Sequence, residues 1–368
     1  WRELIRELVP SWTRGKEPRL YQGPAGDWRL TTSEKKRILL NNIHGVDIDA
    51  QAVEVTKLSL LLKVLEEESQ ESMNAQLKFF HERALPDLSR NIKCGNSLIG
   101  SDFYEGQQLG LLDEEEMYRI NPFDWEDEFA EIMKAGGFDA VIGNPPYVRQ
   151  ESLGEQKSYF KNHYDSYHGI ADLYTYFIER AVSLLSPNGH FSYIVANKWM
   201  RANYGEPLRR WLREQRIEKI IDFGDLPVFK NATTYPCILH LSKPGSGHNP
   251  KPSTFSCVKV RTLDGLNLYE YSEKHAYPVS YKSLDDKGWS LSDIKTQGVL
   301  DKIKACGVPL GEFIQGKIHY GIKTGLNEAF VIDRETRDRL IAGDPKSSEI
   351  LKPFLGGHDI KRYPPLSS

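Results

Sequence analysis

From residue 38 onward, short continuous apolar runs alternate with longer stretches whose apolar residues have helical spacing. Residues 43–46 predict a strand that ends at Asp47, and residues 50–66 predict a helix whose apolar side chains lie on one face. Buried strands that alternate with helices are typical of βαβ units. The pattern therefore predicts an α/β fold built on a parallel sheet.

The same alternation continues to about residue 241. Residues 138–142 predict a second buried strand that ends in a turn at Gly143, and residues 172–185 predict a helix that ends before Pro187 and Gly189. Further strands are predicted at residues 190–195, 217–222 and 235–241.

A segment rich in Pro and Gly then interrupts the pattern. The stretch SKPGSGHNPKPST, residues 242–254, has three Pro, two Gly and no periodicity, which is typical of a linker. Beyond this segment the alternation of helices and strands is lost, and the sequence consists of short segments separated by Gly, such as KIHYGIKTG. We therefore expect a first domain over residues 1–242, a linker over residues 243–255 and a smaller α+β domain over residues 256–368.

The composition is that of a globular protein. The chain has 368 residues, of which 29 are Gly and 20 are Pro, so it is long enough for two or three domains. No apolar run approaches the roughly 18 residues of a membrane span, and no charged-then-apolar leader is present. The four cysteines form no CxxC pair, so we expect a cytoplasmic protein without disulfides or structural zinc. Because the first residue is Trp1, we expect a longer parent polypeptide.

The net charge of −3 by itself speaks mildly against a nucleic-acid partner, since such proteins are usually basic. However, the segment from Asp113 to Glu131 holds nine acids against one base, Arg119, and so contributes −8. The rest of the chain is left at +5. We interpret this as an acidic, solvated loop on a mildly basic body.

The sharpest chemical signal is FDAVIGNPPY, residues 138–147, in which a buried strand ends in an Asn-Pro-Pro-Tyr turn. Open α/β sheets bind their ligands at this end of a strand. Asn144 offers a side-chain carbonyl, and Pro145 offers a backbone carbonyl that no local N–H competes for, because Pro146 has none. Two such acceptors can take both protons of a planar NH2 group and make its nitrogen nucleophilic, while Tyr147 supplies a face for base stacking. An ordinary turn is the alternative.

A second segment, GVDIDAQAV at residues 45–53, could bind a nucleoside. An acid at the end of a strand can accept both hydroxyls of a ribose, and we expect Asp47 to do so. Ile48 would pack on an adenine ring. Asp49 is better explained as a helix N-cap.

A third segment, IKCGNSLIG at residues 92–100, holds Asn96, Ser97 and Leu98 where the base of that nucleoside could lie. We expect Asn96 to hydrogen-bond an adenine edge, and a plain turn is the alternative reading.

Phe229 lies in a polar loop between two predicted strands, in PVFKNATTYPCILHL, beside Lys230. A Phe in such a loop is harder to explain as core than one within a strand. We therefore expect Phe229 to stack on a base together with Tyr147.

Taken in chain order, GVDIDAQAV, GNSLIG, GNPPY, ADLYTYFIERAVSLLSPNGHFSYIVANKW and VFKNATTYP resemble the gamma class of DNA adenine-specific amino-methyltransferases of restriction–modification systems. Large fused restriction–modification enzymes are among them. The segments GIKTGLNEAFVIDRETRDRLI and ILKPFLGGHDIKRY resemble the target-recognition domain that follows the catalytic domain in that family. The resemblance covers about residues 27–368.

The resemblance implies a Rossmann-like class I S-adenosylmethionine-dependent methyltransferase sheet. It implies S-adenosyl-L-methionine as cofactor and double-stranded DNA as substrate, with the target adenine flipped out of the duplex. Residues 256–368 would then recognise the DNA target, and we expect Lys317, Lys323 and Lys230 to contact DNA. A nuclease domain or subunit, where there is one, would lie outside this chain.

One departure from the family is marked. Its Gly-rich GxG loop, which follows the central first strand, should precede the segment LTTSEKKRILLNNIHGVDID, and no such loop occurs there. Gly15, Gly23 and Gly26 do not follow an apolar strand. We therefore expect this chain to lack the central strand of its own sheet.

Two other functions remain open at this point. The NPPY motif is shared with enzymes that methylate a glutamine amide in proteins or a guanine amine in RNA. A methyltransferase fold without its cofactor loop could instead serve as a DNA-binding or specificity protein. No HExxH motif or metal-ligand cluster is evident, so no metal is expected.

Overall fold

The computed structural model describes residues 19–23, 26–65, 86–105, 119–148, 154, 156–230, 234–245, 250–317 and 330–354. The chain divides into two compact units, residues 1–298 and residues 299–368. In the described part of the chain, no helix has both the length and the hydropathy that crossing a membrane requires.

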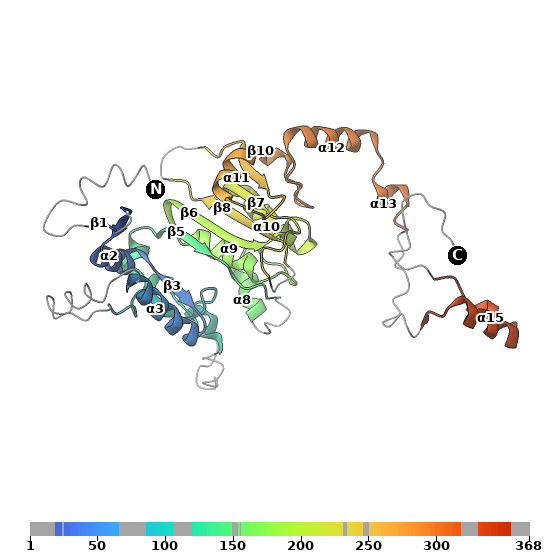
Figure 1. Cartoon of the computed structure of the whole chain (residues 1–368), viewed down its shortest axis with the longest axis horizontal. Coiled ribbons are helices and arrows are strands. Elements are labelled where there is room, and N and C mark those ends of the chain that lie inside the picture. The colour runs from blue at the N-terminus through green and yellow to red at the C-terminus, as the bar shows by residue number, and fades with distance from the viewer. Residues whose placement is uncertain are drawn as a thin grey trace. The chain divides into compact units, whose positions relative to one another are not determined.

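A six-stranded mixed sheet forms the centre of the first unit (Figure 1). Its strands, in spatial order, are β10 (Tyr277–Ser280), β9 (Thr254–Lys259), β7 (Arg216–Asp222), β8 (Pro236–Ser242), β6 (Leu185–Ala196) and β5 (Phe138–Gly143). The pairs β5–β6 and β7–β9 are parallel, whereas β8 runs antiparallel to both of its neighbours. The predicted α/β class is confirmed, but the sheet is mixed rather than parallel, because the described residues between β7 and β8 form no crossover helix.

Two smaller sheets lie in the N-terminal part of this unit. β1 (Leu20–Gln22) and β2 (Trp28–Leu30) pair antiparallel, and β3 (Gly45–Asp47) pairs in parallel with β4 (Ile92–Cys94). Among the described residues, β3 has no partner on its other side, and neither has β5. The side chain of Ile142 on β5 is 82% exposed, so no described element covers that face of the sheet at this position. The first unit therefore contains two strand edges, one on β3 and one on β5, that have no hydrogen-bonded neighbour among the described residues.

The first unit also contains most of the described helices. Their bounds are α2 (Thr32–Asn42), α3 (Ala50–Leu65), α6 (Trp125–Glu128), α7 (Ala130–Lys134), α8 (Gln156–His163), α9 (Tyr174–Ser183), α10 (Glu206–Glu214) and α11 (Leu268–His275). Short 3-10 turns are η1 (Ser101–Tyr104), η4 (Asn197–Met200), η5 (Asn203–Gly205) and η6 (Tyr281–Ser283). Helix α12 (Ile294–Cys306) crosses the division between the units, and the second unit adds α13 (Leu310–Phe313), α15 (Arg334–Gly343) and α16 (Ser347–Ile350).

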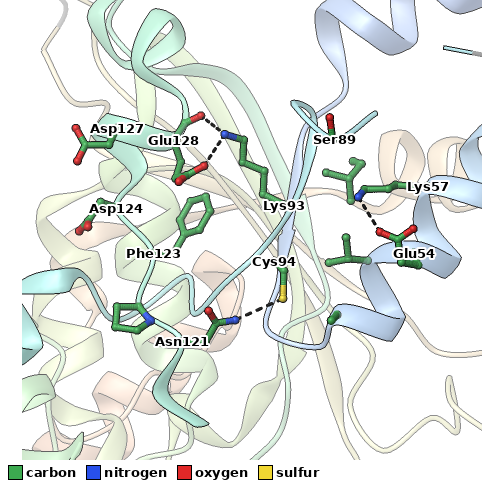
Figure 2. Close-up of a pocket in the computed structure, with 14 residues that line it drawn as sticks. Glu54, Lys57, Ser89, Lys93, Cys94, Asn121, Phe123, Asp124, Asp127 and Glu128 are labelled. Carbon is green, nitrogen blue, oxygen red and sulfur yellow. Dashed lines mark hydrogen bonds and ion pairs between the residues drawn. The ribbon is translucent and has the colours of Figure 1, made fainter. Parts of the chain in front are cut away.

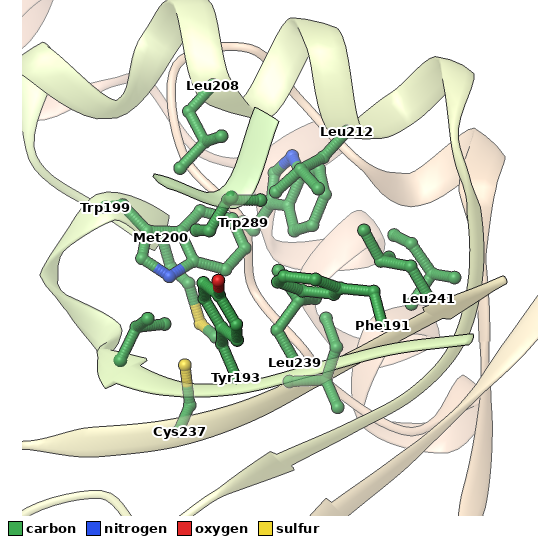
Figure 3. Close-up of a cluster of buried hydrophobic side chains, with 14 of the residues drawn as sticks. Phe191, Tyr193, Trp199, Met200, Leu208, Leu212, Cys237, Leu239, Leu241 and Trp289 are labelled. Carbon is green, nitrogen blue, oxygen red and sulfur yellow. The ribbon is translucent and has the colours of Figure 1, made fainter. Parts of the chain in front are cut away.

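Helices α9 and α10 cover one face of the large sheet. Residues of β6 alternate between this face and the other, so that Phe191 and Val195 are buried while His190 is exposed. Figure 3 shows Leu208 and Leu212 of α10 projecting toward the buried side chains of the strands. This cluster is the main core, and it holds the carboxyl ends of β5 and β6 in place.

The segment predicted as a linker, residues 243–255, does not separate two domains. It connects β8 with β9, and β9 pairs with β7 from Lys219↔Ser256 to Asp222↔Lys259. The boundary expected near residue 243 is thus corrected to the division between Gly298 and Val299. Pro and Gly indicate a loop, but they do not indicate whether the strands on either side of that loop pair in the same sheet.

Arg209 fastens α10 to the turns that follow β6. It is 1% exposed, and its guanidinium donates to the carbonyl oxygens of Asp286 (2.8 Å), Ala202 (2.8 Å) and Trp199. Burial lowers the pKa of Arg209, and Glu206 and Asp286 oppose that shift. Each carbonyl left buried without a partner costs about 1–3 kcal/mol.

We therefore expect Arg209→Met to lower the free energy of unfolding by about 3 kcal/mol or more. Arg210→Met is the matched control, since Arg210 on the same helix is mostly exposed and its ion pair with Glu206 contributes about 0–1 kcal/mol. Urea unfolding measures both. Equal losses in the two variants would contradict the role assigned to Arg209.

Candidate functional site

The NPPY turn directly follows β5, as the sequence predicts. Asn144 and Pro146 are exposed, Pro145 is buried and Tyr147 is half-buried. A Cβ atom on Gly143 would lie 2.7 Å from the ring of Tyr193, so only glycine lets the end of β5 pass this ring without a shift. The turn is therefore placed by close packing of β5 against β6.

Tyr147 ties the turn to the neighbouring strand. Its single hydroxyl hydrogen is shared between two acceptors, Asn144 Oδ1 at 3.2 Å and the carbonyl oxygen of Ile194 at 3.3 Å from the hydroxyl oxygen. Burial is the main cause that raises the pKa of Tyr147, so the hydroxyl keeps its proton at neutral pH. Asn144 Oδ1 has a second lone pair, which stays available to an amine. The ring of Tyr147 packs edge-on against Tyr174, with ring centroids 6.0 Å apart.

Two more polar residues, which the sequence patterns did not indicate, lie where strands end at this edge of the sheet. Asn197, after β6, donates from Nδ2 to Asp222 Oδ1 at 2.9 Å, and Asp222 ends β7. The backbone N–H of Gly224 donates to the same oxygen at 3.0 Å. The signal that could have found Asn197 is the same one that found Asn144, an Asn directly after a buried strand.

Asp47 ends β3, and its side chain is exposed. Its Oδ1 accepts from the N–H of Asp49 at 2.9 Å, and no described residue occupies its other oxygen. Ile48 beside it is 51% exposed. The N-cap prediction for Asp49 is confirmed, because its carboxylate accepts from the N–H of Gln51 at 2.8 Å.

Residues 95–101, which we call the nucleoside loop because the sequence predicts that they bind a nucleoside, lie next to Asp47. The N–H of Gly95 donates to the carbonyl oxygen of Asp47 at 2.8 Å. Asn96 Oδ1 accepts from the N–H of Leu98 at 3.1 Å, so the amide NH2 of Asn96 and the second lone pair of Oδ1 are the groups that it can present to a ligand. Leu98 is only 2% exposed and belongs to a core cluster, so the structure does not place its side chain on a binding surface.

The structure does not bring the residues predicted to contact DNA together with the NPPY turn. Phe229 is half-buried and Lys230 is exposed. In the described part of the chain, no contact joins Phe229 to Tyr147. Lys317 is exposed in the second unit, whereas Lys323 lies outside the described residues.

A hollow of about 590 Å³ lies elsewhere, between α3, β4 and residues 121–128 (Figure 2). Its two lysines are paired, Lys57 with Glu54 at 2.8 Å and Lys93 with Glu128 at 2.6 Å. None of the predicted site residues lines it. In the part of the chain that the structure describes, no three His, Cys, Asp or Glu side chains lie together as metal ligands would.

Comparison with known proteins identifies the class. Residues 41–229 match the family model described as Eco57I restriction-modification methylase, which is half of the chain and includes Asp47, Asn96, Asn144 and Phe229. The chain belongs to this family of restriction–modification methyltransferases.

Individual relatives agree with that assignment. The chain is 30% identical over 332 residues to the type II restriction enzyme and methyltransferase RM.Eco57I of Escherichia coli, over 88% of this chain and 30% of that protein. It is 33% identical over 218 residues to the type II methyltransferase M.PaeR7I of Pseudomonas aeruginosa, over 55% of this chain and 37% of that protein. It is 24% identical to the adenine-specific methyltransferase PglX of Streptomyces coelicolor, over 64% of this chain and 20% of that protein. The chain thus spans between 20% and 37% of the length of these relatives.

Among solved structures, a nuclease-deletion mutant of the Type ISP restriction-modification enzyme LlaGI, in complex with a DNA substrate mimic, gives a TM-score of 0.47 at 14% identity. The similar region covers 80% of this chain and 24% of that one.

Proposed function

We propose that this chain supplies the reactive turn of a DNA adenine methyltransferase, which transfers a methyl group from S-adenosyl-L-methionine to the exocyclic amine of adenine. The observation that carries the proposal is the NPPY turn at the carboxyl end of β5, with the hydroxyl of Tyr147 fixing Asn144. Membership of the restriction–modification methylase family supports it. The adenine-specific relative PglX supports the choice of base.

Asn144 and Pro145 act on the amine. The side-chain oxygen of Asn144 and the carbonyl oxygen of Pro145 accept its two hydrogens, which concentrates electron density on the nitrogen. Pro146 has no N–H to compete for that carbonyl, and Tyr147 holds Asn144 in position. In the transfer, the amine nitrogen would displace the sulfur from the methyl carbon, S-adenosylhomocysteine would leave, and one amine proton would pass to solvent. S-adenosylmethionine, when bound, supplies the electrophilic methyl group.

The residues present fit the nucleoside half of this cofactor. The open carboxylate oxygen of Asp47 suits the ribose hydroxyls, and the exposed side chain of Ile48 suits an adenine face. Asn96 presents its amide NH2 group, which would donate to a ring nitrogen of adenine. Ser97 follows Asn96 in the nucleoside loop. Gly23 and Gly26 lie between the antiparallel strands β1 and β2 and not between a parallel strand and a helix, so the described residues hold no counterpart for the methionine half.

We place one further parallel strand between β3 and β5, with the Gly-rich loop at its end. The open edges of both strands support this placement. The resemblance to the gamma class supports it as well. The strand would come from polypeptide outside the described residues and would complete a class I methyltransferase sheet.

Double-stranded DNA is the proposed substrate, with the target adenine flipped out of the stack so that its amine reaches Asn144. Phe229 would move against the base opposite Tyr147, and Lys230 beside it would neutralise a phosphate. In the second unit, residues 299–368, we assign Lys317 and Lys323 to phosphates next to the recognised sequence. A nuclease domain, as the name of RM.Eco57I indicates for that relative, would lie outside this chain.

Asn144→Ala in the complete enzyme tests the chemistry. We expect the rate of methyl transfer to fall by about 10² or more, the size of effect seen when one hydrogen-bonding group is removed from a reacting centre. Folding and cofactor affinity should be unchanged, because Asn144 is exposed. Incorporation of labelled methyl groups measures the rate, and Asn41→Ala on the exposed side of α2 is the control. A variant that keeps more than a tenth of the rate would rule out this role for Asn144.

Phe229→Ala tests base stacking. A stacked base gains about 1–3 kcal/mol from one aromatic face, so the Michaelis constant for DNA should rise by about fivefold or more, whereas Phe229→Trp should be tolerated. Tyr269→Ala, at an aromatic residue that is 76% exposed on α11, is the control. With 2-aminopurine at the target position, the wild type should increase the fluorescence on binding. No increase in fluorescence would refute base flipping.

A further inference from the structure

The nucleoside loop, residues 95–101, is held by side chains from outside it. Trp125 of α6 donates from Nε1 to the carbonyl oxygen of Ser97 at 3.1 Å. The residue before that helix, Asp124, accepts from the N–H of Ser101 at 3.0 Å. These two contacts come from the segment just before β5, and they fix one side of the loop.

Two tyrosines fix the other side. Tyr164 donates from its hydroxyl to the carbonyl oxygen of Leu98 at 2.7 Å, and the hydroxyl of Tyr159 accepts from the N–H of Gly100 at 3.0 Å. A Cβ atom on Gly100 would approach the carboxylate oxygens of Asp102 and Asp124 to within 3 Å, so the loop passes very close to its supports.

Each tyrosine is itself held. Arg180 of α9 donates to the hydroxyl of Tyr164 at 3.3 Å and lies over its ring. Burial raises the pKa of Tyr164 to about 12, with Arg180 opposing, so this hydroxyl is protonated at neutral pH and can only meet the carbonyl as a donor.

Asp102 of η1 and His163 of α8 hold the side chain of Tyr159 in place. Its hydroxyl donates to Asp102 Oδ1 at 2.8 Å, and Asp102 Oδ2 lies 2.9 Å from His163 Nε2. The ring of His163 stacks on that of Tyr159 at 3.8 Å. The hydroxyl of Tyr159 therefore has a defined direction, with its hydrogen toward Asp102 and its lone pair toward Gly100.

Both tyrosines lie in the part of the chain that follows the NPPY turn. That part is anchored where it leaves the turn, because the N–H of Leu173 donates to the carbonyl oxygen of Val148 at 2.8 Å. Leu98 and Ile99 share a core cluster with Tyr164 and with Tyr176 of α9. The supports of the nucleoside loop and the anchor of the reactive turn thus meet at the start of α9.

We propose that Tyr164 and Tyr159 are positioning residues for the cofactor: they hold the nucleoside loop so that Asn96 faces the adenine of S-adenosylmethionine. This inference rests on the proposed function. A loop already in its binding conformation loses little conformational entropy when a ligand binds. Removing the hydroxyl of Tyr164 leaves the buried carbonyl of Leu98 without its donor and loosens the loop, without touching the reacting atoms.

Tyr164→Phe is the test, and Tyr167→Phe is its matched control. Tyr167 packs against the same cluster and on Tyr176, but among the described residues its hydroxyl makes no hydrogen bond to the nucleoside loop. Hydrogen exchange at residues 96–101 should accelerate about threefold to tenfold in Tyr164→Phe, the range that one lost hydrogen bond gives, and should not change in the control.

In the complete enzyme, Tyr164→Phe should raise the dissociation constant of S-adenosylhomocysteine and the Michaelis constant of the cofactor about threefold to tenfold, with kcat and the Michaelis constant for DNA unchanged. Unchanged exchange in the loop would overturn the proposal. So would a proportional loss in kcat and in both Michaelis constants, which is the pattern of a merely structural role. If no form of the enzyme, wild type included, binds the cofactor, the proposed function fails, and the exchange data still decide whether these tyrosines hold the loop.

Discussion

The parallel pairing of β5 with β6 is the constraint on which the site depends. It runs from Phe138↔Leu185 to Gly143↔Tyr193, and it brings the NPPY turn out at the carboxyl edge of the sheet. There the hydroxyl of Tyr147 reaches the carbonyl oxygen of Ile194 on the paired strand, so the turn is fastened to the strand that positions it. The core under α9 and α10 makes this pairing rigid, and the rigid edge lets a small, exposed Asn144 keep a defined direction.

Much of this arrangement could be predicted from the sequence, because strong local patterns determine it. The helix expected over residues 50–66 is α3, with the predicted apolar face in contact with the core. The strand expected over residues 138–142 is β5, and the turn after it lies where the motif places it. The strand expected over residues 190–195 is longer, since β6 begins at Leu185 and takes in the Pro and Gly that had been interpreted as a helix stop.

What the sequence could not supply is long-range pairing. Nothing in residues 254–259 indicates that they add to the edge of β7, so composition alone put a domain boundary where the sheet continues. Leu98 was expected to face a ligand because of its motif, yet its contacts with Tyr164 and Tyr176, far away in the chain, bury it. For the same reason the tyrosines that hold the nucleoside loop carry no local signal: their partners are about 60 residues away.

The proposed function requires that this turn activates the exocyclic amine of adenine. Identifying the methylated product tests it most directly: the complete enzyme is incubated with duplex DNA and S-adenosylmethionine labelled in the methyl group, and the DNA is digested to nucleosides and separated. We predict that the label appears in deoxyadenosine methylated on its exocyclic nitrogen. Label in a cytosine, or in protein or RNA instead of DNA, would contradict it.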